Sequence, residues 1–186
     1  MTHVSPWMKL SVHFDADQTS SELDYKFTSC DGTADPRHGE YMGGVHFQQG
    51  QHVYIDINCC GSKKSGFTSF QIIDCSIVTI PQLTQIGPNV PTVYAAPSPF
   101  LQAVGAVYPL QLDFESQLLP QDPELPDLRR IRQEWKHSLD VGHTKGRWEL
   151  SFVLTVRILR GDNVQPELRV FAFDPESSVG GSLDMG

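Results

Sequence analysis

Several features that identify common protein classes are missing from this sequence. It has no apolar run as long as a membrane-spanning helix, and its N-terminus has no basic segment followed by an apolar stretch. Lys and Arg number 14 against 22 Asp and Glu, so the net charge is −8 and no basic stripe is present. A general nucleic-acid surface neutralises phosphates with many basic side chains. We therefore expect a soluble, cytoplasmic protein with neither a nucleic-acid nor a membrane partner.

Motifs of the commonest enzyme mechanisms are absent as well. There is no G-x-S-x-G nucleophile elbow, no P-loop and no glycine-rich dinucleotide fingerprint. Ser, His and Asp residues are present, but their spacing singles out no triad, and a convergent triad stays open. We predict no catalytic residue and no cofactor, which favours a protein that is not an enzyme.

The four cysteines are Cys30, Cys59, Cys60 and Cys75, and they match neither a secreted disulfide framework nor a paired C-x-x-C zinc site. Cys59 and Cys60 are adjacent, so on a strand their side chains point to opposite faces. We predict reduced thiols, with Cys75 in the core. A reactive thiolate at Cys59 or Cys60 beside His52 is the alternative.

The clearest structural signal lies in the segment Arg147–Glu176. From Trp148 to Ile158 the even positions carry large apolar side chains and most odd positions are polar. This period of two is typical of a strand with one face on a core. After a turn at Gly161–Asn163, the run Leu168–Phe173 is apolar on nearly both faces and predicts a more central strand. We interpret the two strands as a long hairpin in the middle of a sheet.

Further alternating segments predict a mainly all-β chain. We expect strands at Trp7–Phe14, Leu23–Ser29 and Gly50–Asn58. In Phe67–Ile80 the apolar phase slips, which a β-bulge or a bend between two shorter strands would explain. These patterns indicate a single antiparallel β-sandwich domain over residues 1–176.

Residues 81–146 interrupt the strand pattern as an insertion. Nine prolines between Pro81 and Pro126 predict a long excursion over the sheet, with one strand near Tyr108–Phe114. Residues 127–139 then predict an amphipathic helix that docks on the sandwich, because the apolar side chains recur at helical spacing: Leu128, Ile131, Trp135 and Leu139. The small residues of 177–186 predict a flexible tail.

Two rows of polar residues suggest a metal site. His13 is followed at alternate positions by Asp15 and Asp17, and His52 by Tyr54 and Asp56. If the two strands are neighbours, His13, His52 and Asp56 could hold a divalent metal, because imidazole and carboxylate suit several such ions. The competing interpretation is a solvated strand face, and the sequence does not establish that the rows are adjacent.

Four short features resemble the bacterial AidA/PixA family of inclusion-body and quorum-regulated proteins: an early strand ending in an Asp-rich turn, the Gly-led strand Gly50–Asn58, the Trp-led strand Trp148–Ile158, and Phe-x-Phe-Asp-Pro at Phe171–Pro175. The last motif also resembles the small bacterial DP-EP family. The resemblance covers about half the chain, and it implies an immunoglobulin-like β-sandwich, intracellular abundance and self-assembly, with no catalytic residues to carry over. The Pro-rich insertion, the helix, and Glu176-Ser177 after the Asp-Pro depart from the family pattern.

Three hypotheses for function follow. The first is a non-enzymatic homo-oligomer that acts by self-association or binding through its sheet edges and the excursion Tyr94–Phe114. The second is a carbohydrate- or small-ligand-binding module whose aromatic residues stack on the ligand. The candidate residues for that platform are Trp7, Trp135, Trp148 and the loop tyrosines Tyr94 and Tyr108. The third is a metal-dependent enzyme built on His13 and His52.

Overall fold

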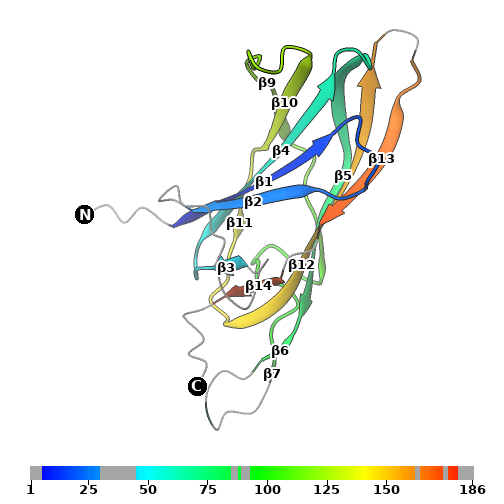
Figure 1. Cartoon of the computed structure of the whole chain (residues 1–186). Coiled ribbons are helices and arrows are strands. Elements are labelled where there is room, and N and C mark those ends of the chain that lie inside the picture. Colours follow the sequence, from blue (N-terminus) through cyan, green and yellow to red (C-terminus); the bar gives the residue numbers. More distant parts are fainter. Residues whose placement is uncertain are drawn as a thin grey trace.

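The computed structural model describes residues 6–29, 45–84, 88, 93–161, 164–173 and 176–179. Within these residues the chain is all-β, as predicted, with 14 strands and no helix. None of the described residues therefore forms a helix that could cross a membrane. Figure 1 shows long strands running through most of the molecule, with the shorter strands grouped towards its ends.

The first sheet is mixed. Its order is β2 (Asp24–Ser29), β1 (Trp7–Asp15), β4 (His52–Ser62), β10 (Leu128–Trp135) and β9 (Phe114–Leu118). The short β11 (Leu139–Asp140) also pairs with β4. β1 runs parallel to β4, whereas the other pairs are antiparallel, so the prediction of a purely antiparallel arrangement is wrong here.

The second sheet has the order β3 (Val45–Phe47), β14 (Glu176–Val179), β12 (Gly146–Arg160), β5 (Phe67–Pro81) and β8 (Val107–Pro109), and β13 (Glu167–Phe173) also pairs with β12. Two further strands, β6 (Leu83–Thr84) and β7 (Val93–Tyr94), pair with each other. Residues 177–179 belong to β14, so the predicted flexible tail does not begin at residue 177. Residues 30–44 and 180–186 lie outside the described residues.

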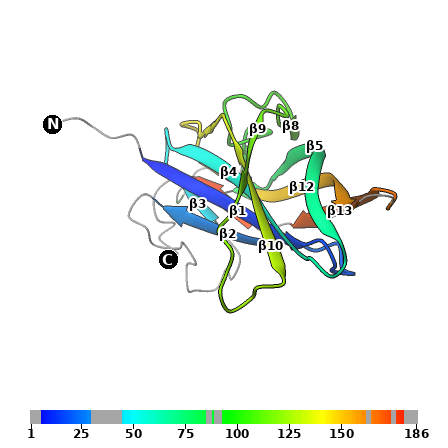
Figure 2. The same cartoon turned by 90° about the horizontal axis from the view of Figure 1, so that it is seen from above.

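The two sheets share one hydrophobic core. Phe14 of β1 contacts Phe70 of β5, with ring centroids 5.3 Å apart, and stacks on Phe171 of β13 at 4.8 Å. Figure 2 shows β1 and β4 on one side of the molecule and β5, β12 and β13 on the other. The core contains the side chains predicted for β12, because every even position from Trp148 to Ile158 is at most 1% exposed. Alternation was therefore a sound guide along this strand.

The predicted hairpin is confirmed, but its second strand is not central. β12 and β13 pair antiparallel from Phe152 opposite Phe173 to Ile158 opposite Glu167. Leu168 and Val170 are more than half exposed, and only Phe171 and Phe173 of β13 are buried. Only one face of β13 is therefore buried. The apolar residues on its exposed face made its sequence resemble that of a strand buried on both faces.

The phase slip predicted in Phe67–Ile80 is a β-bulge in one continuous strand. Thr155 of β12 pairs with Asp74, and the next residue of β12 pairs with Ile72, so Ile73 is the extra residue. The buried positions change from Phe70 and Ile72 before the bulge to Cys75 and Ile77 after it. The extra residue turns the rest of β5 so that apolar side chains of both parities reach the core.

The predicted helix at 127–139 is wrong, because residues 128–135 form β10. On this strand the inward positions are Ile131, Gln133 and Trp135. Gln133 is polar, yet it is buried and donates a hydrogen bond from Nε2 to the carbonyl of Phe70 in the opposite sheet at 2.8 Å. A polar residue at an inward position broke the apolar alternation and left the helical spacing as the stronger pattern.

The Pro-rich excursion adds a strand to each sheet. The predicted strand near Tyr108–Phe114 is divided between them, since β8 ends at Pro109 on the second sheet and β9 begins at Phe114 on the first. Leu110, between the two, is buried in the shared core. The excursion therefore contributes to the core that the two sheets share.

Candidate ligand-binding site

The outward face of the first sheet carries the polar rows of β1 and β4. The parallel pairing places Lys9 opposite Tyr54 and Ser11 opposite Asp56. On the other side of β4, Glu134 of β10 is also opposite Asp56. Alternate residues of all three strands thus meet on one surface.

Asp56 is the electrostatic centre of this surface. Although it is on the outward face, it is only 2% exposed. Its Oδ2 atom lies 2.7 Å from Nζ of Lys9 and 3.7 Å from Nε of Arg132. Its Oδ1 atom accepts a hydrogen bond from Nδ2 of Asn58 at 3.0 Å. These partners compensate the cost of removing the carboxylate from water.

Glu134 completes a balanced set of charges. Its Oε1 atom lies 3.6 Å from Nζ of Lys9 and 3.6 Å from Nη1 of Arg132. Arg132 also donates from Nε to Oδ1 of Asn58 at 3.1 Å. Two cations and two carboxylates therefore share this region, and their charges cancel.

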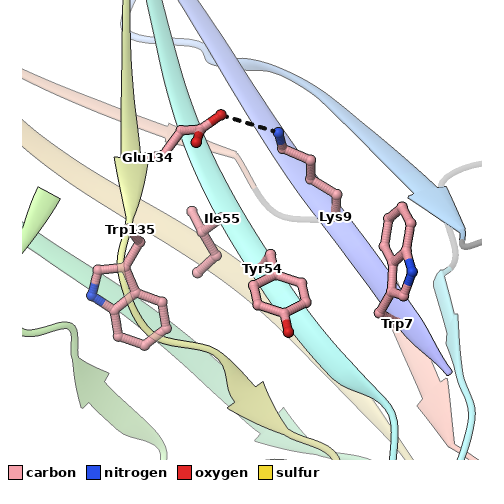
Figure 3. Close-up of a pocket in the computed structure, with 6 residues that line it drawn as sticks. All are labelled: Trp7, Lys9, Tyr54, Ile55, Glu134 and Trp135. Carbon is pink, nitrogen blue, oxygen red and sulfur yellow. Dashed lines mark ion pairs between the residues drawn. The ribbon is translucent and has the colours of Figure 1, made fainter. Parts of the chain in front are cut away.

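A pocket of about 360 Å³ opens beside this charged network. Three aromatic residues, an ion pair and one aliphatic side chain line it: Trp7, Tyr54, Trp135, Lys9, Glu134 and Ile55. Figure 3 shows the Tyr54 ring between those of Trp7 and Trp135, with the Lys9–Glu134 pair along one side. Tyr54 is 44% exposed, so an aromatic surface is available to a ligand.

The pocket forms where the chain leaves β4 after β10. Glu134 pairs with Asp56, and the next pairing to β4 is that of Leu139 with Val53 in β11. The segment from Glu134 to Leu139 advances five residues, whereas β4 advances only three residues between the two pairing positions. The additional residues therefore bulge away from the sheet. Trp135, at the start of this departure, donates from its indole Nε1 to the carbonyl of Gln111 at 2.9 Å, which fixes one wall.

The two His rows are on adjacent strands, but the three predicted metal ligands do not come together. His13 is opposite Asn58 and His52 is opposite Trp7, so the histidines are six residues apart along the paired strands, or roughly 20 Å at about 3.3 Å per residue. His52 pairs instead with Asp140 through Nδ1 and Oδ1 at 2.6 Å. Across the described part of the chain, no three His, Cys, Asp or Glu side chains are grouped as a metal would require.

His13 faces the charged network rather than His52. Desolvation lowers the pKa of His13 below its ordinary value, although the side chain keeps part of its surface in water. The carboxylates of Asp56 and Asp24 oppose this shift, whereas the cations of Arg132 and Lys26 add to it. The neutral imidazole is therefore favoured over more of the acidic range than in a free histidine.

Asp17, at the end of the His13 row, has a structural role. It accepts hydrogen bonds from Nη1 of Arg160 at 2.8 Å, from Oγ of Ser65 at 3.0 Å and from the amide of Ser62 at 2.9 Å. Partial burial acts to raise the pKa of Asp17, but these hydrogen bonds outweigh it and hold the pKa below its ordinary value. The carboxylate joins the end of β1 to the β4–β5 turn and to the end of β12.

The described cysteines are free thiols, and the alternative of a reactive thiolate loses its support. Cys59 and Cys75 are buried, and desolvation raises the pKa of both thiols. Desolvation, with a contribution from Asp15, raises the pKa of Cys60 to about 11. Cys75 lies in the core, as predicted, and Cys30 is outside the described residues.

The predicted tyrosine ligands are away from the pocket. Tyr94 is in β7 opposite Leu83 and is 70% exposed, whereas Tyr108 is in β8 and packs against the core. Trp148 is fully buried, with its indole donating to the carbonyl of Ala96, so it offers no platform. Of the suggested aromatic platform, Trp7 and Trp135 line the pocket.

Tyr54 and Lys9 lie in segments whose alternation of apolar and polar residues predicts strands. Glu134 could not be assigned to the site from the sequence, because its segment was interpreted as a helix. The strand alternation of Ile131 and Trp135 around Gln133 was the signal available for it. Comparison with protein-family models and with curated proteins finds no match to this sequence.

Proposed function

We propose that the protein is a non-enzymatic binding protein that takes a small ligand in the pocket between β1, β4 and β10. The observation that carries this proposal is one concave site that combines three aromatic residues, among them the exposed ring of Tyr54, with the Lys9–Glu134 ion pair. Binding pockets combine apolar surface, which supplies affinity, with a few polar groups that orient the ligand. The site has both.

The charged groups beside the pocket are paired with one another. Lys9 is held against the buried carboxylate of Asp56 at 2.7 Å, and Glu134 faces two cations. Paired charged groups at the edge of an aromatic pocket provide hydrogen-bonding positions that can orient a ligand.

Ligand-observed NMR with a chemically diverse small-molecule library tests the proposal. Saturation-transfer signals seen with the wild-type protein should be lost with Tyr54→Ala, which removes the most exposed ring of the pocket. The matched control is Tyr94→Ala, since Tyr94 is also an exposed tyrosine but lies outside the pocket. Signals that persist in Tyr54→Ala, or a library without any binder, would contradict the proposal.

Self-association is a second candidate function, favoured by exposed apolar side chains on the outward face of the second sheet. Leu168 and Val170 of β13, Ile80 of β5 and Val107 of β8 are all more than half exposed. Val107 is opposite Val78 and Ala172 is opposite Val153, while polar residues such as Asp74 and Arg157 share the same face. A second copy of the chain would bury this face in a homo-oligomer, because single-sided apolar sheet surfaces gain free energy by leaving water.

Light scattering coupled to size-exclusion chromatography tests the second candidate. The wild-type protein should elute as a defined oligomer, and Val170→Asp should dissociate it. Val164→Asp is the control, since Val164 is half exposed but lies outside the strands. A wild-type monomer at high concentration would remove this candidate.

The finer fold and cellular setting are also proposals. The shared core of two facing sheets supports an immunoglobulin-like β-sandwich, and so does the burial of Phe171 and Phe173 from the Phe-x-Phe-Asp-Pro motif. Kinship with the AidA/PixA proteins rests on those motifs. Free thiols at Cys59, Cys60 and Cys75 support a reducing, cytoplasmic compartment. Fractionation of native cells would test the compartment.

A further inference from the structure

We propose that the pocket's ligand is a carbohydrate, in which a neutral sugar ring stacks on Tyr54 and Trp7 and exchanges hydrogen bonds with Lys9 and Glu134. This inference rests on the proposed binding function and names the class of ligand. It is argued from the aromatic surface, the charge balance and the hydrogen-bonding groups of the site.

The aromatic surface suits a molecule with an apolar face and a polar rim. Trp7 and Tyr54 are diagonal neighbours on paired strands, a spacing within reach of aromatic side chains. Figure 3 shows them next to each other along the same wall of the pocket. A pyranose ring presents C–H groups on its faces and hydroxyl groups at its edge. It can therefore stack on aromatic rings while its hydroxyl groups keep hydrogen-bond partners.

The charge balance of the site disfavours an ionic ligand. Lys9 and Arg132 are matched by Asp56 and Glu134 within 3.7 Å. An anion would have to compete with the buried carboxylate of Asp56 for Lys9, in a chain whose net charge is −8. A cation would find the aromatic rings and Glu134 favourable, but it would meet the ammonium group of Lys9 in the same lining. A neutral ligand avoids both penalties.

The polar groups of the pocket match hydroxyl chemistry. The ammonium group of Lys9 has three N–H donors, and its closest partner is the carboxylate of Asp56. Glu134 is half exposed, and its two carboxylate oxygens can accept hydrogen bonds. A sugar hydroxyl is both donor and acceptor, so adjacent hydroxyl groups can bind to Lys9 and Glu134 at once. Charged partners give stronger hydrogen bonds than neutral ones, which provides orientation.

Isothermal titration calorimetry with defined probes tests the inference. The probes are linear hexasaccharides of α-1,4-glucose, β-1,4-glucose, β-1,4-xylose, β-1,4-mannose and β-1,4-N-acetylglucosamine, with choline chloride and sodium benzoate as the cationic and anionic arms. At least one saccharide should bind, and Tyr54→Ala should weaken its binding at least about tenfold, as expected for loss of a central aromatic contact.

Two further variants separate stacking from a general loss of structure. Tyr54→Phe keeps the ring, so it should weaken binding less than Tyr54→Ala does. Glu134→Gln removes a charged acceptor and should weaken binding by several-fold, whereas Tyr94→Ala should bind like the wild type. Urea unfolding of each variant verifies that the compared proteins are folded.

The possible outcomes distinguish this inference from the proposed function. Failure of every saccharide to bind, on a glycan array as well as by calorimetry, overturns the carbohydrate assignment. If choline, benzoate or a library compound then binds in a Tyr54-dependent manner, the proposed binding function stands and only the ligand class is wrong. Saccharide binding that survives Tyr54→Ala overturns the assignment of the sugar to this pocket. Absence of any ligand overturns both.

Discussion

Replacing Lys9 by methionine should destabilise the fold, because it leaves a buried carboxylate without its closest partner. Methionine keeps most of the apolar stem against the sheet, so the change isolates the ammonium group. Asp56 is 2% exposed and lies 2.7 Å from Nζ of Lys9. Removing one member of a buried ion pair costs about 3–5 kcal/mol, whereas an exposed pair contributes about 1 kcal/mol or less.

The Lys9–Asp56 pair is intermediate between a fully buried ion pair and an exposed one. Lys9 is 32% exposed, and Asp56 keeps the amide of Asn58 at 3.0 Å and Arg132 at 3.7 Å. We expect Lys9→Met to lower the free energy of unfolding by about 2 kcal/mol. For a domain of this size, that loss corresponds to a fall in Tm of about 4–8 °C.

Urea unfolding at neutral pH, followed by tryptophan fluorescence, measures the effect. The matched control is Lys26→Met on β2, which removes the same charge from an exposed position on the same face. The control should change stability by less than about 0.5 kcal/mol. If Lys9→Met is as mild as the control, the Lys9 ammonium does not compensate the burial of Asp56, and our description of the charged network fails.

Three further predictions concern other parts of the fold. Asp17→Asn should lower stability at neutral pH by about 1 kcal/mol or less, because the hydrogen bonds and the Arg160 ion pair that lower the pKa of Asp17 lie at a solvent-exposed position. Its stabilisation is present above the unfolded-state pKa and lost as pH falls through the folded-state pKa, so urea midpoints of variant and wild type should converge in acid. Gln133→Ala should cost about 0.5–1.5 kcal/mol by the same assay, because it removes the hydrogen bond that joins the two sheets at the carbonyl of Phe70. In a Cys30→Ser variant, the remaining three thiols should react slowly with Ellman's reagent at pH 8 when folded and fast in urea, since burial raises their pKa values.

Each of these predictions has a clear contrary result. A constant difference between Asp17→Asn and wild type down to strongly acidic pH would show that the carboxylate's charge is not what stabilises the fold. A neutral Gln133→Ala would mean that the bond between the sheets is dispensable. Rapid labelling of folded Cys30→Ser would contradict the burial of the thiols.

The fold was predictable from the sequence where buried positions carry apolar side chains and exposed positions carry polar ones. In β12 every inward side chain is apolar, and even the bulge at Ile73 of β5 left a visible change of phase. Prediction failed where burial and polarity disagree. Gln133 is polar but buried because a carbonyl of the other sheet satisfies it, and Leu168 of β13 is apolar but exposed. Neither condition can be known before the partner sheet is in place.

The candidate site was predictable in its parts and not in its assembly. The alternating rows containing Lys9 and Tyr54 are local patterns, but their register depends on the parallel pairing of β1 with β4, which brings distant segments together. The pocket exists because the chain leaves β4 after Glu134 and returns at Leu139. No local signal records that departure, and the interpretation of this segment as a helix concealed it.

The most direct test of the ligand-binding pocket follows the indole N–H signals of the three tryptophans by ¹H–¹⁵N NMR. The hexasaccharides are added to the labelled protein while the signals are recorded. Trp7 lines the pocket and Trp148 is fully buried away from its lining, so the chain contains its own control. We predict that the Trp7 signal moves with saturation as the ligand is added and that the Trp148 signal stays in place. A ligand that binds without moving the Trp7 signal would contradict the assignment of the pocket.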